Sequence, residues 1–148
     1  MKTMRNDIIV AASAEEVWVV LVAFSLYPEW NPFLRTIIGN ASEGEQLRIT
    51  AKLDGLPELS FRATISTCVS PFKLGWKAIF LKGVFEAHHH FEIQELGATT
   101  CRFIHSEEFL GFFSKPVLFI LESTFKNGYR MMNEALKERV EGTLMKRN

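Results

Sequence analysis

Three ionisable side chains interrupt the apolar faces of two neighbouring strand-like segments. His89 lies on the apolar face of residues 84–95, and His105 and Glu107 lie on the apolar face of residues 99–110. Successive residues of a strand point to opposite sides, so the odd-numbered positions of each segment share one face. Burying a polar group without a hydrogen bond costs about 1–3 kcal/mol. The three side chains must therefore bond to one another or to a ligand.

The short linker between the two segments predicts how they pair. Residues 96–98 have the length and the glycine of a three-residue hairpin loop. Pairing across such a loop would place His89 opposite His105, with Glu107 two residues further along the second strand. We expect one hydrogen-bonded cluster that faces the interior of the protein and holds no metal.

The cluster admits four interpretations. It can orient a mostly apolar ligand, or supply an acid or base at the reactive end of a substrate. Two histidines and a carboxylate can also form a metal triad, and the same groups can form a structural network that closes one side of the core. The neighbouring His88 and His90 point away from His89 in a strand, so the three consecutive histidines do not make a metal site.

The composition is that of a chain able to bury a substantial core. Its 148 residues fit one domain, 47% of them are hydrophobic, and thirteen are Phe. Seventeen basic residues balance seventeen acidic ones, which gives no electrostatic reason to expect nucleic acid or an anionic membrane as a partner. No cofactor is expected, and the oligomeric state stays open.

Targeting and redox signals point to an ordinary reduced protein. The N-terminal residues lack an apolar stretch of signal-peptide length, and no apolar run reaches the roughly 18 residues of a membrane span. We therefore expect a cytoplasmic protein without stable membrane insertion. Cys68 and Cys101 stand alone in strand patterns and are interpreted as reduced packing residues.

The hydrophobic pattern predicts a helix near the start, a series of strands and a long last helix. After a short strand at residues 8–10, Ser13 and Glu16 form a capping box that opens a helix, and prolines confine residues 27–33 to a turn or a very short helix. Strand patterns follow at residues 34–40, 46–53, 58–69, 72–80, 84–95 and 99–110. The breaks between them are short, which favours an antiparallel meander.

The last helix is predicted from residue 115 to residue 141, with Pro116 in its first turn and Gly142 as its stop. Its inward stripe carries Leu121, Phe125, Gly128, Met132, Ala135 and Leu136. Glycine within a helix costs about 1 kcal/mol relative to alanine. Gly128 on the inward stripe therefore suggests that space is needed there.

Loops at one end of the predicted sheet carry many large apolar side chains. Meander parity places residues 54–57, 81–83 and 111–114 at the same end as residues 27–33. Solvated loops seldom hold so many apolar groups, so these loops either gate a cavity or plug the end of the sheet. Docking on a membrane is a third interpretation, although no basic cluster surrounds the loops.

Local motifs resemble one family along nearly the whole chain. Residues 12–18 (ASAEEVW) and 27–33 (YPEWNPF) resemble the opening of the polyketide cyclase/dehydrase-like branch of the START-related (SRPBCC) superfamily. The hairpin is similar to that branch at residues 89–93 (HHFEI) and 105–111 (HSEEFLG), as is the end of the long helix at residues 131–137 (MMNEALK). The resemblance implies an α+β protein with the helix-grip fold. In that fold a curved seven-stranded antiparallel sheet wraps around a long C-terminal helix, with two short helices after strand 1.

The resemblance also implies a deep apolar cavity between sheet and helix. Its predicted ligand contacts are Trp30, Phe61, Phe72, Trp76, Phe91, Phe103, Phe125, Gly128 and Met132, with His89, His105 and Glu107 as the polar corner. The leading hypothesis is that one START-like domain over residues 1–148 binds or carries a small hydrophobic molecule, such as a lipid, an aromatic polyketide or an isoprenoid. The alternatives are a cyclase, dehydrase or hydrolase with a cavity histidine as general base, and a co-chaperone or interaction module.

Overall fold

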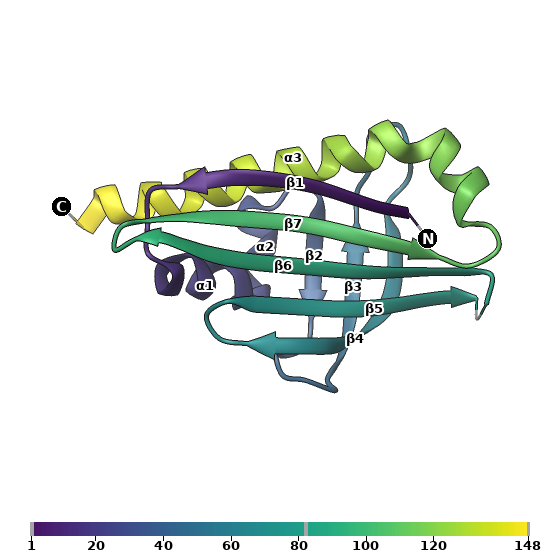
Figure 1. The fold of residues 1–148 in the computed structure, drawn as a ribbon, viewed down its shortest axis with the longest axis horizontal. Helices are drawn as coiled ribbons and strands as arrows, with labels where there is room; N and C mark the ends of the chain where they lie inside the picture. Colours follow the sequence, from purple (N-terminus) through teal and green to yellow (C-terminus); the bar gives the residue numbers. More distant parts are fainter. Residues whose placement is uncertain (1, 82, 148) are drawn as a thin grey trace.

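The computed structural model describes residues 2–81 and 83–147. Figure 1 shows a curved sheet with one long helix along it and the shorter helices gathered near one end. All neighbouring strands are antiparallel, in the order β1-β7-β6-β5-β4-β3-β2. In chain order the elements are β1 (Lys2–Val10), α1 (Ala14–Val22), η1 (Phe24–Leu26), α2 (Tyr27–Trp30), β2 (Leu34–Ile38), β3 (Gln46–Ala51), β4 (Leu59–Val69), β5 (Lys73–Leu81), β6 (Phe85–Gly97), β7 (Thr100–Leu110) and α3 (Ser114–Arg147).

The predicted helix-grip fold is confirmed, and the bounds of β2 to β7 differ from prediction by one or two residues. The largest difference among the strands is β1, which begins at Lys2 rather than at Ile8. It pairs with β7 along its whole length, from Lys2 opposite Phe109 to Val10 opposite Cys101. One side of β1 is exposed and polar, so a search for apolar runs finds only its last residues.

The short helices follow the predicted local signals. At the start of α1, the Ser13 hydroxyl accepts a 3.2 Å hydrogen bond from the Glu16 amide, and the Glu16 carboxylate accepts a 3.0 Å bond from the Ser13 amide. This capping box satisfies two backbone groups that the start of a helix otherwise leaves unpaired. α2 is one turn long, as the prolines around it predicted.

Asn31 turns the chain from α2 into β2. Its side-chain oxygen accepts hydrogen bonds from the backbone N–H groups of Phe33 (3.0 Å) and Leu34 (2.9 Å), and the residue is fully buried. Asn side chains stabilise turns in this way. The turn directs Phe33 into the interior, where its ring centroid lies 6.3 Å from that of His89 and 6.2 Å from that of His105.

The hairpin between β6 and β7 is tighter than predicted, and its pairing differs by two residues. β6 continues to Gly97 and β7 starts at Thr100, with an irregularity in register just before the turn. His89 therefore lies opposite Glu107, and the predicted pairing of His89 with His105 is wrong. A shift of two residues keeps every side chain on its side of the sheet, so the predicted inner face is retained.

The long helix α3 continues beyond its predicted end. It contains 34 residues, which corresponds to about 51 Å at 1.5 Å per residue. It packs against β1 and β7, and Figure 1 shows it running alongside them. Gly142 lies within the helix rather than after it. Glycine ends a helix where it adopts a left-handed conformation, and Gly142 does not adopt one.

The closed part of the core lies between the inner face of β5 to β7 and the helices. Phe91 and Phe103 stack there, with ring centroids 5.6 Å apart and an interplanar angle of 22°. Leu21 of α1 and Leu136 of α3 are fully buried against the same core. In residues 2–81 and 83–147, none of the helices combines the length and the apolar character of a membrane span.

Candidate functional site

Three neighbouring strands bring an indole, an imidazole and a carboxylate side by side. Trp76 of β5 lies opposite His89 of β6, which in turn lies opposite Glu107 of β7. The imidazole stacks on the indole, with ring centroids 5.3 Å apart and an interplanar angle of 25°. His105 lies two residues before Glu107 on the same face of β7. It therefore reaches His89 along the diagonal of the sheet.

These groups belong to one continuous chain of hydrogen bonds, which confirms the prediction that His89, His105 and Glu107 form one hydrogen-bonded cluster. His89 Nδ1 lies 3.0 Å from Glu107 Oε2, and His89 Nε2 lies 2.5 Å from His105 Nε2. His105 Nδ1 lies 3.0 Å from Asn133 Oδ1. The side-chain amide of Asn133 donates to the backbone carbonyl of Asn6 over 3.0 Å. This chain of hydrogen bonds, the polar chain, thus joins β6, β7, α3 and β1.

Helix α3 contributes two side chains whose spacing matches that of the strand beside it. The Tyr129 hydroxyl donates to Glu107 Oε1 over 2.5 Å, and Asn133, one turn later, contacts His105. Residues four apart on a helix are separated by about 6 Å along its axis, and residues two apart on a strand by about 6.7 Å. All four side chains are buried. One turn of α3 therefore satisfies two successive inward positions of β7.

The hydrogen-bond partners determine where the protons lie. The Asn6 carbonyl only accepts, so Asn133 turns its NH₂ group toward it and its oxygen toward His105, whose Nδ1 must then donate. Burial, together with the nearby His89, lowers the pKa of His105 well below its usual 6.5. His105 is thus neutral at pH 7, and its Nε2 accepts a hydrogen bond from His89 Nε2.

One proton is then shared between His89 Nδ1 and Glu107 Oε2. On nitrogen it makes an imidazolium beside a carboxylate, and on oxygen it makes a neutral imidazole beside a carboxylic acid. Tyr129 donates to the other carboxyl oxygen in both arrangements. Burial and the Glu107 carboxylate raise the pKa of Tyr129 well above its usual value, so its hydroxyl keeps its proton. A pair that holds one mobile proton can act as an acid or as a base.

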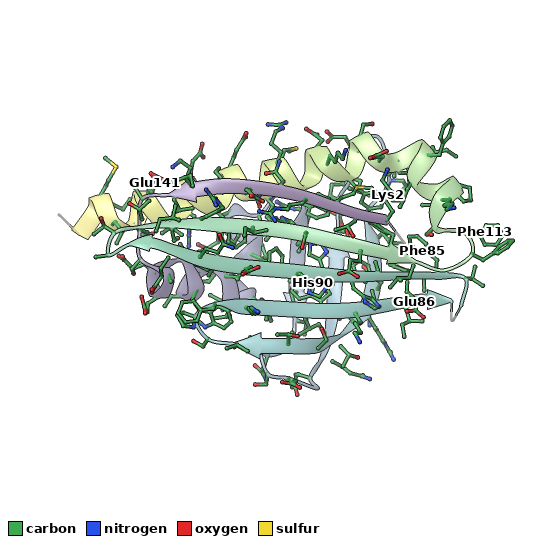
Figure 2. The ribbon with its side chains drawn as sticks, viewed as in Figure 1. Lys2, Phe85, Glu86, His90, Phe113 and Glu141 are labelled. Carbon is green, nitrogen blue, oxygen red and sulfur yellow. The ribbon has the colours of Figure 1, made fainter. Side chains whose placement is uncertain are left out.

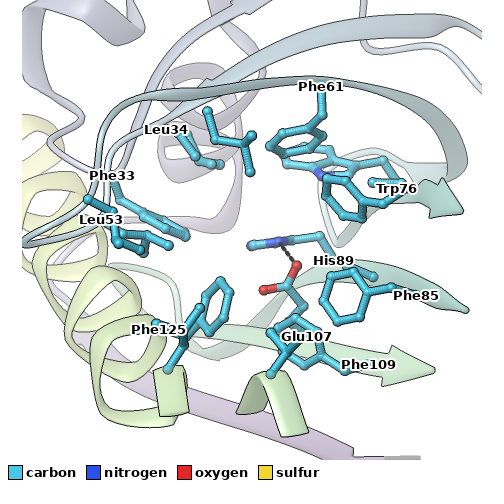
Figure 3. Close-up of a pocket in the computed structure, with 18 of the residues that line it drawn as sticks. Phe33, Leu34, Leu53, Phe61, Trp76, Phe85, His89, Glu107, Phe109 and Phe125 are labelled. Carbon is cyan, nitrogen blue, oxygen red and sulfur yellow. Dashed lines mark hydrogen bonds and ion pairs between the residues drawn. The ribbon is translucent and has the colours of Figure 1, made fainter. Parts of the chain in front are cut away.

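An apolar cavity opens beside this pair. Its volume is about 310 Å³, the space of roughly ten water molecules in the liquid. The side chains that line it are apolar except for His89, Glu107 and the indole N–H of Trp76. Figure 3 shows the Glu107 carboxylate pointing into the space bounded by Phe33 and Phe125. A volume of this order is typical of small-molecule sites.

The cavity extends from an exposed apolar rim to a buried polar end. Leu59 and Phe80 are 52% and 40% exposed, whereas Glu107 is 7% exposed. Leu56 and Pro57, in the loop between β3 and β4, also line it. A ligand that entered past this loop would meet apolar side chains first and the polar pair last.

The structure brings five of the twelve predicted ligand contacts to the cavity wall: Phe61, Trp76, His89, Glu107 and Phe125. The other seven predicted contacts do not line this cavity. These are Trp30, Phe72, Phe91, Phe103, His105, Gly128 and Met132. Phe91 and Phe103 point to the predicted side of the sheet but fill the closed part of the core. Parity identified the face of each strand and not the depth at which the cavity ends.

The remaining misplacements have separate physical reasons. Phe72 is 38% exposed because it belongs to the turn before β5. Trp30 packs against Tyr27 in α2, with ring centroids 5.0 Å apart. His105 is fully buried behind His89, with both ring nitrogens bonded to protein atoms. Met132 is fully buried in the core.

Gly128 is closely packed, which corrects the prediction that space surrounds it. A β-carbon at this position would lie 2.7 Å from Cδ1 and 2.9 Å from Cε1 of Phe33. Non-bonded carbon atoms normally stay about 3.5–4.0 Å apart. The Phe33 ring therefore packs on the helix backbone, where it meets the Tyr129 ring nearly edge-on at 5.6 Å. Gly128 permits this close approach, and Phe33 covers the polar chain.

Only some of the loops that were predicted to gate a cavity lie at it. Leu56 and Pro57 line the cavity, but Phe112 and Phe113 are 81% and 51% exposed and lie outside its lining. Figure 2 shows Phe113 at the end of the molecule where the chain enters α3. Lys82, in the predicted gating loop at residues 81–83, lies outside the described residues.

Sequence reasoning missed Tyr129 and Asn133, which complete the polar chain. Both lie beside the predicted inward stripe of α3, four residues apart and therefore on one face of the helix. Two polar residues at this spacing on a buried face were the available signal. Asn6 was missed as well: the Asn133 amide donates both to its backbone carbonyl (3.0 Å) and to its side-chain oxygen (2.8 Å).

The geometry does not suit the metal triad that the residue types allowed. His89 and His105 direct one nitrogen of each ring at the other, and their remaining nitrogens face Glu107 and Asn133. Within the described residues, no three His, Cys, Asp or Glu side chains are arranged to hold a metal ion. The cluster instead places a proton-holding pair at the polar end of an apolar cavity.

Comparison with protein families identifies a relationship across most of the chain. A family model described as polyketide cyclase / dehydrase and lipid transport matches residues 1–141. Sequence comparison with curated proteins gave no significant match.

Several solved structures share the fold. The aromatase/cyclase Zhui from Streptomyces sp. R1128 has a TM-score of 0.77 and 14% identity, over 95% of this chain and 93% of that one. A START superfamily protein from Mycobacterium smegmatis has a TM-score of 0.73 and 20% identity, over 95% and 98%. Norcoclaurine synthase from Thalictrum flavum, in complex with dopamine and hydroxybenzaldehyde, has a TM-score of 0.70 and 19% identity, over 95% and 87%.

Proposed function

Because the chain belongs to the polyketide cyclase / dehydrase and lipid transport family, we propose that it binds a small hydrophobic molecule in the cavity between its sheet and α3. The observation that carries the proposal is the cavity of about 310 Å³, apolar along its wall and polar at its buried end. The norcoclaurine synthase structure, which holds dopamine and hydroxybenzaldehyde, supports a small aromatic ligand in this fold. The proposal treats residues 1–148 as one ligand-binding domain, whose ligand is a lipid, an aromatic polyketide or an isoprenoid.

The chemistry of the wall favours an apolar occupant. Burying apolar surface contributes about 25 cal/mol per Å², and aromatic side chains supply much of the surface here. An interaction module with a filled core, one of the alternatives that the sequence left open, is at odds with this cavity.

Two variants on neighbouring positions of β5 test the proposal. Ala78 is 2% exposed and lines the cavity, whereas Lys77 points to the outer, exposed face. Ala78→Leu should occupy part of the cavity and weaken binding of the fluorescent probe N-phenyl-1-naphthylamine by about tenfold or more. Lys77→Leu adds the same side chain outside the cavity and should leave binding unchanged. Equal probe affinity in both variants would contradict the proposal.

The second candidate function is an enzyme, and one observation favours it. The proton between His89 and Glu107 lies at the cavity wall, where a general acid or base would have to be. His105 is too deeply buried to serve as that base. Native mass spectrometry of protein from its own host, before and after incubation with host extract, distinguishes the two functions. A bound molecule that persists unchanged supports carriage, and one whose mass changes only when Glu107 is intact supports catalysis.

A further inference from the structure

The proton arrangement at the end of the cavity determines which ligand chemistry it accepts. Both nitrogens of His89 are engaged, one by Glu107 and one by His105. The imidazole therefore offers the cavity no free donor or acceptor. Of the described side chains that line the cavity, Glu107 is the one with acceptor capacity left.

Glu107 presents only acceptor sites, wherever the shared proton lies. A carboxylate has about four lone-pair sites, and Tyr129 and His89 use two of them. If the proton moves to Glu107 Oε2, that O–H is directed at His89 Nδ1 and not at the cavity. In both arrangements, the carboxyl group can thus only accept a hydrogen bond from a ligand in the cavity.

Charge further narrows the class of ligand that the cavity accepts. The His89–Glu107 pair is neutral overall in both arrangements, because one proton serves the two groups. A carboxylate ligand would bring an uncompensated negative charge into an apolar space beside this neutral pair, and an ammonium ligand would bring an uncompensated positive charge. Burying an unpaired charge is far more costly than burying a hydroxyl group.

We infer that the cavity selects neutral apolar molecules with one hydroxyl group, phenolic or alcoholic, whose O–H donates to Glu107. This inference rests on the proposed ligand-binding function and specifies the class of ligand for the same site. The apolar wall would hold the apolar part, and the hydroxyl would reach the buried end.

A matched set of small aromatic probes tests the inference by isothermal titration calorimetry at pH 7. 2-Naphthol should bind about tenfold or more tightly than 2-methoxynaphthalene, which has the same ring system without the donor; tenfold corresponds to 1.4 kcal/mol. 2-Naphthoate should bind most weakly of the three. Equal affinity for 2-naphthol and 2-methoxynaphthalene would overturn the inference and leave the proposed function intact. Failure of every probe to bind would overturn both.

The substitution Glu107→Gln sharpens the test because it keeps the hydrogen bonds to Tyr129 and His89. The group that faces the cavity changes from a hydrogen-bond acceptor to a donor. The new amide can accept from Tyr129 and donate one N–H to His89 Nδ1, so its second N–H faces the cavity. The preference for 2-naphthol should disappear, and 2-acetonaphthone, which only accepts hydrogen bonds, should bind more tightly than to the wild type.

Glu108→Gln is the control, because Glu108 lies on the outer face of β7 beside His90. It should retain the wild-type preference. Loss of the preference in the control, or its survival in Glu107→Gln, would overturn the assignment of the hydroxyl to Glu107.

Discussion

Replacing Gly128 with alanine should destabilise the protein, even though alanine is the better helix former. α3 contains two glycines in ordinary helical conformation, Gly128 and Gly142, and each substitution gains up to about 1 kcal/mol of helix propensity. At Gly142 the added methyl group meets open space. At Gly128 it would lie 2.7 Å from the Phe33 ring.

The difference in stability between Gly128→Ala and Gly142→Ala measures how tightly Phe33 is held. Overpacking a filled site typically costs about 1–3 kcal/mol, so Gly128→Ala should lose up to about 2 kcal/mol while Gly142→Ala gains up to about 1 kcal/mol. In a chain of this length 1 kcal/mol shifts the melting temperature by roughly 2–4 °C. The two variants should therefore melt roughly 2–12 °C apart.

Thermal and urea unfolding followed by circular dichroism would measure this difference. The open side of the Phe33 ring is the cavity, so the displaced ring should also weaken binding of N-phenyl-1-naphthylamine in Gly128→Ala and not in Gly142→Ala. Equal stabilisation by both substitutions would refute the reasoning. It would mean that Phe33 moves aside freely and that Gly128 is not needed for close packing.

Two further predictions concern the buried polar chain. Tyr129→Phe should lower the free energy of unfolding by about 1–3 kcal/mol, because a buried Glu107 oxygen loses its donor; an unchanged value in urea unfolding at pH 7 would argue against that hydrogen bond. His105→Gln, which can still donate to Asn133 and accept from His89, should flatten the acid side of the stability curve. Burial lowers the pKa of His105 in the folded protein, so the unfolded chain binds the extra proton below about pH 6.5, and stability falls with falling pH by at most about 1.4 kcal/mol per unit. An equal slope in the wild type and the variant would exclude His105 as its source.

Local signals predicted much of the fold because each one acts within a few residues. The capping box at Ser13 and Glu16 requires only the first turn of α1. Alternation along β6 and β7 identified the inner face correctly, and it survived an error in register because the error was two residues. Where the local rule has an exception, prediction was wrong, as at Gly142, which stays helical without a left-handed turn.

The candidate site was harder to predict because it depends on how separate elements are placed against one another. His89 meets Glu107 through the register of one hairpin, which shifts between Glu95 and Gly97 just before the turn, and the apolar pattern carries no signal of that shift. The closed part of the core and the cavity have the same composition in sequence, since Phe91 and Phe85 are both inward phenylalanines of β6. One fills the core, and the other lines the cavity.

The contact between Phe33 and Gly128 shows why the closed part of the core could not be told from the cavity in the sequence. From the sequence, a glycine on a buried helix stripe is compatible with empty space and with a ring packed on the backbone, and these have opposite consequences. The ring that packs there comes from a turn held by Asn31, about a hundred residues earlier in the chain. Phe33 packs against His105 and Tyr129 on the side of α3, while the Glu107 carboxylate points into the cavity. The hydroxyl-accepting end that we infer for the cavity therefore lies beside this packing contact, which no local pattern in the sequence indicates.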